Sequence, residues 1–170
     1  MFVLSQNWPQ TSYWYLNDKW QEAEAEIHLS NQTTYAWTLH GLWPTSNKNR
    51  FFPKNCRIDS SRFERLNFKL LSDMKKHWYS CNSKVNNRKF WKHEWIKHGS
   101  CANDLNTTNS LKKYFSKSVT LLKNYNVGNV LRKHGIVPGK EYFIRNINKA
   151  LFKTWGVKTQ VICAKSPVNI

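Results

Sequence analysis

Apolar residues recur at helical spacing through the middle of the chain. The segment Ser61-Arg-Phe-Glu64 has the form of a capping box, and the stripe that follows it predicts a helix: Phe63, Leu66, Leu70, Leu71 and Met74. Similar patterns predict helices over 110–125, closed by Asn126-Val-Gly128, and over 142–152 after a turn at Pro138-Gly139. Segments 1–8, 34–42 and 157–163 are typical of strands, and Trp43-Pro44 ends the second. Strands toward both ends with helices between them predict an α+β fold.

The length and composition favour one folded domain over 1–170. A chain of 170 residues can bury a core, and 40% hydrophobic residues with nine tryptophans are unlike a disordered segment. No apolar run approaches the roughly 20 residues that a membrane span needs. Met1-Phe-Val-Leu runs directly into polar residues, so we recognise no signal peptide and expect that a secreted form has lost its leader.

The charge of the chain is strongly positive and unevenly distributed. There are 27 Lys and Arg residues against 10 Asp and Glu, a net charge of +17, and 105–170 hold Glu141 as their one acid. Such a surface attracts polyanions, which include nucleic acid, sulfated glycans and acidic membranes. The alternative is a basic surface that only aids solubility.

The cysteines and two short sequence patterns favour an extracytoplasmic protein. Cys56, Cys81, Cys101 and Cys163 are spaced too widely for a C-x-x-C metal site. Asn31 and Asn106 each begin an N-glycosylation sequon. An even number of cysteines together with sequons is typical of proteins from oxidising compartments.

The stretch FWKHEWIKHGSC, residues 90–101, superficially resembles a zinc-protease helix. Such a helix needs histidines at i and i+4, whereas His93 and His98 are five apart and point about 140° from each other. Glu94 instead shares one face with Lys97 and His98, and Gly99 is a plausible helix stop. The alternative to a site is a solvated charged face on a helix anchored by its opposite edge: Phe90, Trp91 and Trp95.

A second group of chemically active residues lies in WTLHGLWP, residues 37–44. We expect His40 at a strand end, with Gly41 allowing the backbone to approach a ligand and Trp43 offering a stacking face. Taken alone, His40 would be a core histidine. Metal-free RNA cleavage, however, needs one group that removes the ribose 2′-hydroxyl proton and another that protonates the departing 5′-oxygen. His40 and His98 suit these tasks, with Lys97 as a fixed cation and Glu94 keeping an imidazole protonated.

These two segments, in this order and about fifty residues apart, resemble the active-site segments of the ribonuclease T2 family. Weaker likeness extends to FVLSQNWP at the start, to residues 52–56 and to Val161-Ile-Cys163. The resemblance implies an α+β fold with an antiparallel central sheet and several flanking helices. It also implies cofactor-free endonucleolysis of single-stranded RNA through 2′,3′-cyclic phosphate ends, with an acidic pH preference, in a secreted, lysosomal or vacuolar protein.

The resemblance also implies a role for individual residues. His98 would be the base of the first step and His40 the acid, while Glu94 and Lys97 would stabilise the pentacovalent phosphate. The remaining implied positions are phosphate binding by His93, one base pocket at Trp43 and Phe51, a second at Phe90, and a disulfide between Cys56 and Cys101.

Three departures from the family pattern leave questions open. Thr45 stands where many relatives carry an acid, so base preference is undecided. Tyr13 and Trp14 occupy the place of an expected cysteine, so Cys81 and Cys163 could pair, stay free or link two chains. The charge suggests added affinity for RNA, glycans or cell surfaces. The second hypothesis is therefore a cationic RNA- or glycan-binding glycoprotein without catalysis, and a third is a secreted, cytotoxic ribonuclease.

Overall fold

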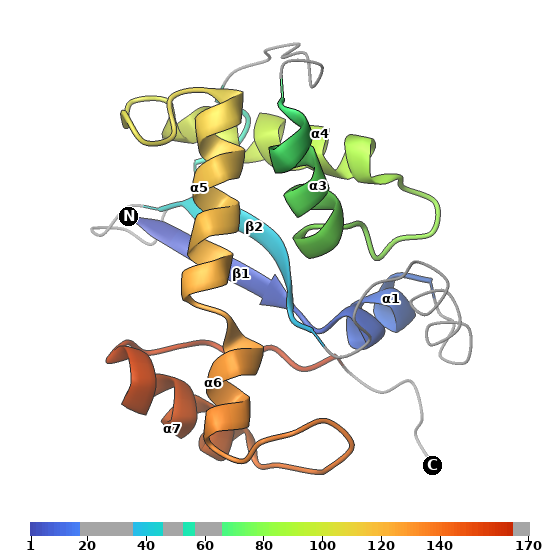
Figure 1. Cartoon of the computed structure of the whole chain (residues 1–170), viewed down its shortest axis with the longest axis vertical. Coiled ribbons are helices and arrows are strands. Elements are labelled where there is room, and N and C mark those ends of the chain that lie inside the picture. The colour runs from blue at the N-terminus through green and yellow to red at the C-terminus, as the bar shows by residue number, and fades with distance from the viewer. Residues whose placement is uncertain (18–35, 46–52, 57–65, 165–170) are drawn as a thin grey trace.

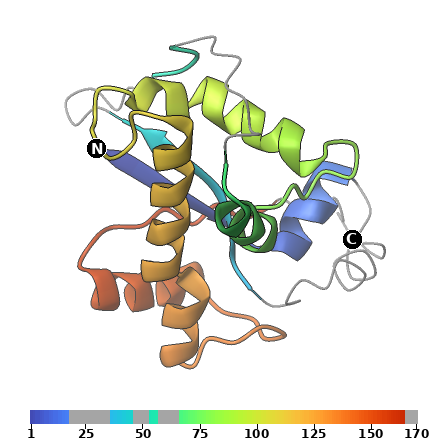
Figure 2. The same cartoon turned by 45° about the horizontal axis from the view of Figure 1, so that its top comes forward.

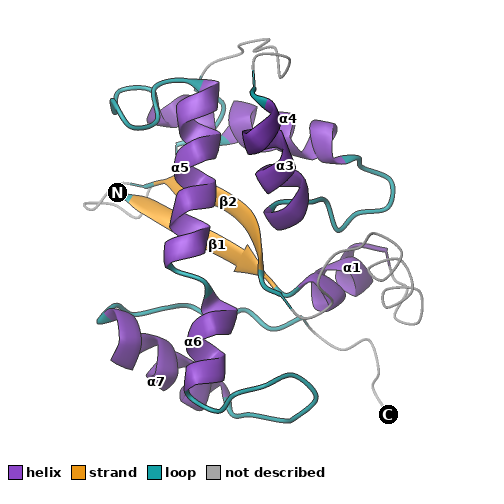
Figure 3. Ribbon diagram, in the orientation of Figure 1, coloured by secondary structure: helices purple, strands orange, loops and turns teal. Residues whose placement is uncertain are grey.

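The computed structural model describes residues 1–17, 36–45, 53–56 and 66–164. Helices surround a small sheet, which confirms the predicted α+β class (Figures 1 and 3). The elements are β1 (Phe2–Asn7), α1 (Pro9–Asn17), β2 (Thr38–Pro44), α3 (Phe68–His77), α4 (Asn87–Lys97), the 3-10 helix η2 (Gly99–Ala102), α5 (Leu111–Asn124), α6 (Val127–Lys133) and α7 (Ile144–Trp155).

The sheet of the described residues has two antiparallel strands and one irregularity. Ser5 of β1 pairs with Gly41 of β2, but the next residue, Gln6, pairs with Leu39. His40 is therefore the extra residue of a β-bulge, a feature that locally re-aims the side chains of a strand. Because of the bulge, Leu39 and Leu42 both enter the core although they are three residues apart.

Several helices begin at a polar residue that caps the first turn. The side chains of Asn67, Asn86, Ser110 and Asn126 each accept a hydrogen bond from a backbone N–H three residues later, at the start of α3, α4, α5 and α6. The predicted helix over 110–125 is confirmed as α5. The capping box at 61–64 lies outside the described residues, and α3 begins at Phe68.

Helix α5 ends at Asn124, which confirms the predicted closure at Asn126-Val-Gly128, but Asn126 also caps α6, a helix that the sequence did not predict. The predicted strand over 157–163 is wrong. Residues 157–163 form no strand. Val157 and Ile162 are exposed, and alternation predicts a strand only where a neighbouring strand can supply hydrogen bonds.

The main core lies between the sheet and helices α3, α4 and α5. Its fully buried side chains include Trp78, Tyr114 and Phe115. A smaller cluster, containing Val130 and Leu151, packs α6 against α7, and both views keep this pair at the end of the molecule away from α4 (Figures 1 and 2). Within the described ranges, none of the helices has the length and apolarity required to cross a membrane.

Candidate active site

The bulged strand β2 presents His40 and Trp43 to helix α4. His40 lies within β2 rather than at a strand end, as was expected, and its side chain is 40% exposed. The rings of His40 and Trp43 meet edge to face with 5.2 Å between centroids. A regular strand would send side chains three apart to opposite faces, so the bulge brings these two together.

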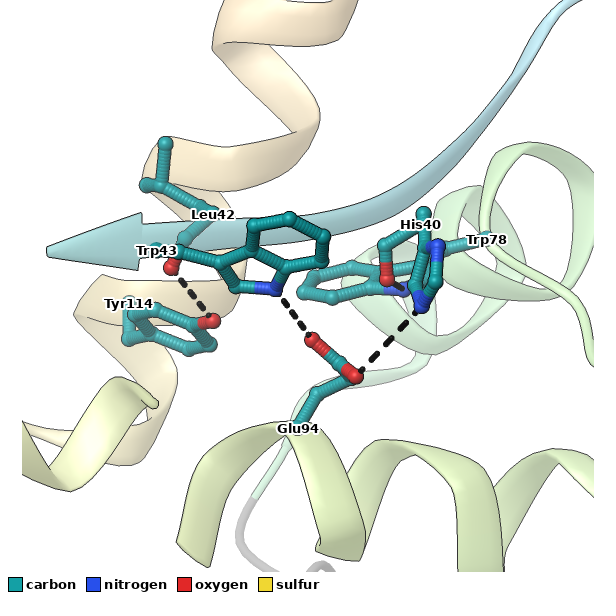
Figure 4. A network of polar contacts seen from close by, with 6 residues as sticks. All are labelled: His40, Leu42, Trp43, Trp78, Glu94 and Tyr114. Atoms are coloured by element: carbon teal, nitrogen blue, oxygen red, sulfur yellow. Dashed lines mark hydrogen bonds and ion pairs between the residues drawn. The ribbon is translucent and has the colours of Figure 1, made fainter. Parts of the chain in front are cut away.

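Glu94 is held between these two side chains (Figure 4). Its carboxylate, only 2% exposed, accepts a hydrogen bond at Oε2 from Trp43 Nε1 at 3.0 Å. Its other oxygen, Oε1, lies 4.0 Å from Nε2 of His40. A carboxyl group has two oxygens with several acceptor sites, so beyond the hydrogen bond from Trp43 it has capacity for a further partner while it faces the imidazole of His40.

Gly41 makes this arrangement possible. A Cβ atom at this position would overlap both Oε2 of Glu94 and Nε1 of Trp43. The sequence suggested that the glycine admits a ligand, but the groups that approach its backbone are the protein's own carboxylate and indole. Any side chain here would separate the two partners of the Trp43–Glu94 hydrogen bond.

Two buried aromatic residues fix the backbone of β2 on either side of Gly41. Trp78 Nε1 donates to the carbonyl of His40 at 2.8 Å, and the Tyr114 hydroxyl donates to the carbonyl of Leu42 at 2.9 Å (Figure 4). Sequence reasoning did not identify this role. The available signal is that both rings carry a polar group, which needs a partner once the ring is buried.

His98 follows the last residue of α4 and packs against the ring of Trp43. Its backbone N–H donates to the carbonyl of Glu94 at 3.1 Å, so both side chains depend on the same helical turn. The His98 ring is tilted by 32° over Trp43, with 5.2 Å between centroids. His98 is 7% exposed, and its buried Nδ1 has no hydrogen-bond partner within the described part of the chain. Both histidines therefore contact one indole.

Three further predicted site residues lie near the two histidines, and the others lie elsewhere or outside the described residues. The Phe90 ring lies 6.0 Å from that of His40, and Lys97 and His93 are near enough to affect both histidines electrostatically. Phe51 lies outside the described residues, as does Asn31. Asn106 is exposed in a turn, while the hydroxyl of Thr108 in the same sequon is buried and donates to Ala102.

The local environment shifts the ionisation of several groups in the site, Glu94, His40 and His98 among them. Burial raises the pKa of Glu94 to about 7, against smaller opposing effects of the Trp43 hydrogen bond and the Lys97 charge. Burial, followed by the positive charges of Lys97 and His93, lowers the pKa of His98 to about 4. The same causes in the same order lower the pKa of His40 below its ordinary 6.5. A buried carboxyl group with the pKa of Glu94 is mostly uncharged at acidic pH, which weighs against its predicted role in keeping an imidazole protonated.

A disulfide joins Cys56 to Cys101, as the family resemblance implies. It is reinforced by a backbone hydrogen bond of 3.0 Å from Asn55 N–H to the carbonyl of Lys97. The described segment 53–56 is thus attached at two points to the end of α4. Cys81 is buried and Cys163 is exposed, and the two do not form a disulfide with each other.

The residue types in the site are suited to proton transfer and phosphate binding. Nowhere in the described ranges do three or more His, Cys, Asp or Glu side chains gather as they would around a metal ion. Two imidazoles, a protonatable carboxyl group and a nearby ammonium can give and accept protons and balance negative charge.

Comparisons with known proteins agree with this chemistry. The family model described as Ribonuclease T2 family matches residues 1–169. The chain is similar to Ribonuclease T2-A of Mus musculus, 34% identical over 163 residues that cover 95% of this chain and 56% of the mouse protein. It is also similar to Ribonuclease T2 of Homo sapiens, 37% identical over 131 residues, covering 75% of this chain and 48% of the human protein. The chain thus spans about half the length of these relatives.

Solved structures resemble the fold closely. A crystal structure of human RNase T2 has a TM-score of 0.73 and 32% identity, covering 92% of this chain and 73% of that chain. The structure of RNase NT in complex with 5′-AMP has a TM-score of 0.75 and 27% identity, covering 98% and 77% respectively.

Proposed function

The chain belongs to the ribonuclease T2 family, and we propose that it is an endoribonuclease that cleaves single-stranded RNA. The observation that carries the proposal is the contact of His40 and His98 with the same indole, beside a buried carboxyl group. Acid–base cleavage needs two such imidazoles within reach of one phosphodiester. The ribonuclease names of the relatives and the 5′-AMP bound to RNase NT support the substrate class.

The first step is an internal transfer of the phosphoryl group. His98 removes the proton of the ribose 2′-hydroxyl, the 2′-oxygen bonds to phosphorus, and the bond from phosphorus to the 5′-oxygen breaks as His40 protonates that oxygen. The products are a 2′,3′-cyclic phosphate and a free 5′-hydroxyl. In the second step the roles reverse, because His40 is now neutral and can activate water while His98 returns its proton to the 2′-oxygen.

Glu94 and Lys97 stabilise the pentacovalent phosphate in different ways. Lys97 supplies positive charge, and its effect on the pKa of both histidines supports a position close to both. The pKa of Glu94 is about 7, so in acid the group is a neutral carboxylic acid that can donate a hydrogen bond to a phosphate oxygen. His93 is exposed one residue before Glu94 and assists phosphate binding.

The aromatic rings beside His40 supply the base-binding surfaces. Trp43 and Phe90 lie at 5.2 and 6.0 Å from the His40 ring, and bases on the two sides of the scissile phosphate stack on them. Phe51 is proposed to join Trp43 on the basis of the sequence alone. Stacking is tolerant of base identity, so this arrangement favours broad rather than strict base preference.

An extracytoplasmic location completes the proposal. The Cys56–Cys101 disulfide is stable in oxidising compartments, and Asn106 is exposed where a glycan could be attached. We propose a secreted or lysosomal protein with glycans at Asn31 and Asn106. A mass decrease on treatment with an N-glycosidase, absent from the Asn106→Gln and Asn31→Gln double variant, tests the glycans.

Cleavage of a single-stranded RNA in the presence of EDTA tests the activity. We expect fragments that end in 2′,3′-cyclic phosphate, identified by mass spectrometry, at acidic pH. RNA that stays intact between pH 4 and 8 rejects the proposal, and so does cleavage that stops when metal is chelated. Intact RNA together with tight RNA binding would instead support the non-catalytic binding hypothesis.

A further inference from the structure

A cavity lies where α3, α5 and α6 meet the start of β2. It has a volume of about 260 Å³ and shares no residue with the proposed catalytic set. We call it the α3–α6 pocket; the lining residues that matter here are Trp37, Thr38, Lys76, His77, Lys123 and Arg132. In Figure 1, α6 continues from the lower end of α5 and β2 begins between them and α1.

Thr38 gives the pocket an unsatisfied polar group. The residue is 3% exposed, and its Oγ1 has no hydrogen-bond partner among the residues that the structure describes. A buried hydroxyl without a partner costs roughly 1–3 kcal/mol, and valine would serve the strand without that cost. Thr38 lines the pocket, and its hydroxyl has no partner among the described residues that a ligand would have to displace.

The charge around the pocket favours an anion. Lys76, His77, Lys123 and Arg132 line it, and the carboxylate that faces them is that of Asp73, which pairs with Lys123 at 2.9 Å. Burial first, and then the charges of Lys123 and Lys76, lower the pKa of His77, while Asp73 alone opposes this. The positive charges thus exceed the negative charge available, and a bound phosphate would balance them.

The pocket also has a flat aromatic wall. A Cβ atom at Gly128 would come within 3.0 Å of Cδ1 of Trp37, so the glycine allows this indole to lie close to α6. The pocket volume is slightly below the roughly 300 Å³ at which small-molecule sites usually begin. A phosphate with part of its nucleoside suits this size and this combination of cations and aromatic surface.

We propose that the α3–α6 pocket binds a phosphate of the RNA strand outside the reacting dinucleotide, with Arg132, Lys76 and the Thr38 hydroxyl as its contacts. Thr38 precedes His40 by two residues on β2, which corresponds to about 7 Å along a strand. A strand that occupies the active site can reach the pocket within a few nucleotides. This inference rests on the proposed function, because it assumes that RNA lies across His40.

A non-cleavable RNA analogue tests the pocket separately from catalysis. The probe is a single-stranded 2′-O-methyl hexanucleotide, which lacks the nucleophilic hydroxyl, and its Kd is measured by fluorescence anisotropy. The pocket variant is Lys76→Gln with Arg132→Gln; the control, with the same loss of charge, is Lys149→Gln with Lys153→Gln on exposed positions of α7. We expect the pocket variant to weaken binding about 10-fold more than the control. Equal weakening by the two variants overturns the proposal.

Cleavage of a dinucleoside monophosphate separates this proposal from the proposed function. That substrate is too short to reach the pocket, so the pocket variant should keep the native kcat/KM within about twofold. If no protein cleaves any RNA but the pocket variant still binds the hexanucleotide more weakly than the control, the proposed function fails and the pocket stands. A large loss on the dinucleotide shows that the pocket residues act on the catalytic site instead, and contradicts a remote subsite.

Two further measurements, on Thr38→Val and with inorganic phosphate, distinguish a site for an RNA phosphate from a site for free phosphate. Without ligand, Thr38→Val should raise Tm because it removes the unpaired hydroxyl, and it should weaken hexanucleotide binding. A phosphate-induced rise in Tm that the pocket variant lacks, with hexanucleotide affinity equal to that of the control, would indicate a site for free phosphate and overturn the RNA subsite.

Discussion

Trp43 donates a hydrogen bond from Nε1 to Oε2 of Glu94 at 3.0 Å, which links β2 directly to α4 at the centre of the site. The indole therefore does more than offer a face for stacking, because its polar edge holds the carboxyl group opposite His40. Burial of that carboxyl group raises its pKa and allows it to act as a neutral donor in acid. The packing of α4 against β2 thus both positions the Glu94 carboxyl group and, by burying it, raises its pKa.

Replacing either histidine should remove most of the activity. We expect His40→Ala and His98→Ala each to lower kcat/KM for single-stranded RNA by roughly 10²–10⁴-fold, since each removes one proton transfer. Initial rates with a fluorogenic oligonucleotide give the measurement. His134→Ala, at an exposed histidine beyond α6, is the control and should stay near the native value. Activity of either site variant within threefold of the control contradicts the assignment.

The pH dependence of kcat/KM should be bell-shaped and acidic. His98 must be neutral to act as a base and its pKa is about 4, so activity rises as pH increases through about 4. His40 must be protonated to act as an acid and its pKa lies below 6.5, so activity falls before pH 6.5. Lys97 lowers both pKa values, and Lys97→Met should shift both limbs upward while reducing the maximum. A downward shift would contradict this electrostatic account.

Gly41→Ala should damage the site because the added methyl group overlaps Glu94 and Trp43. We expect a loss of kcat/KM of about 10-fold or more, with the change in kcat larger than in KM, as the carboxyl group leaves its position. The control is Ser5→Ala, because Ser5 on β1 pairs with Gly41. It changes the same position of the sheet without adding an atom near Glu94 or Trp43. Native kcat in Gly41→Ala would show that the Trp43–Glu94 contact is not needed.

Glu94→Gln should change the pH dependence of stability. A carboxyl group whose pKa rises from 4.5 to about 7 on folding stabilises the native state fully below pH 4.5 and less as pH rises through 7. Glutamine cannot ionise and still accepts the Trp43 hydrogen bond. The difference in Tm between Glu94→Gln and the native protein should therefore grow in favour of the variant from pH 4.5 to 8. Glu141→Gln, at an exposed acid, should show no such trend.

Removing the Cys56–Cys101 disulfide should lower stability. The bond closes a loop with a sequence separation of 45, for which the chain-entropy model gives about 4 kcal/mol. Urea unfolding of the Cys56→Ser and Cys101→Ser double variant measures this loss. Cys163→Ser, at an exposed free cysteine, should leave the midpoint unchanged. A midpoint in the double variant equal to that of Cys163→Ser would contradict the prediction.

The sequence predicted the helical segment 110–125 and the first strand, because each depends on a local pattern. It also predicted that the segments containing His40 and His98 meet in one site. The bulge at His40 was not predicted, since one extra residue in a strand is decided by pairing with β1. A signal was present: Leu39 and Leu42 are three apart, which is incompatible with one face of a regular strand.

The raised pKa of Glu94 and the existence of the α3–α6 pocket could not be predicted from the sequence, because both depend on how distant segments pack together. Glu94 was expected to remain charged beside Lys97, whereas tertiary packing buries it almost completely. The pocket collects Thr38, Lys76, Lys123 and Arg132 from four elements, and none of these residues is distinctive in its own segment. Only the folded chain brings them together.

A substrate with sulfur in place of the 5′-bridging oxygen tests the central claim, that His40 is the acid and His98 the base. A thiolate leaves without being protonated, so the substitution removes the need for an acid but not for a base. We predict that His40→Ala cleaves this substrate nearly as fast as the native protein while His98→Ala remains inactive, both in EDTA. Rescue of His98→Ala, or failure to rescue His40→Ala, would contradict the account.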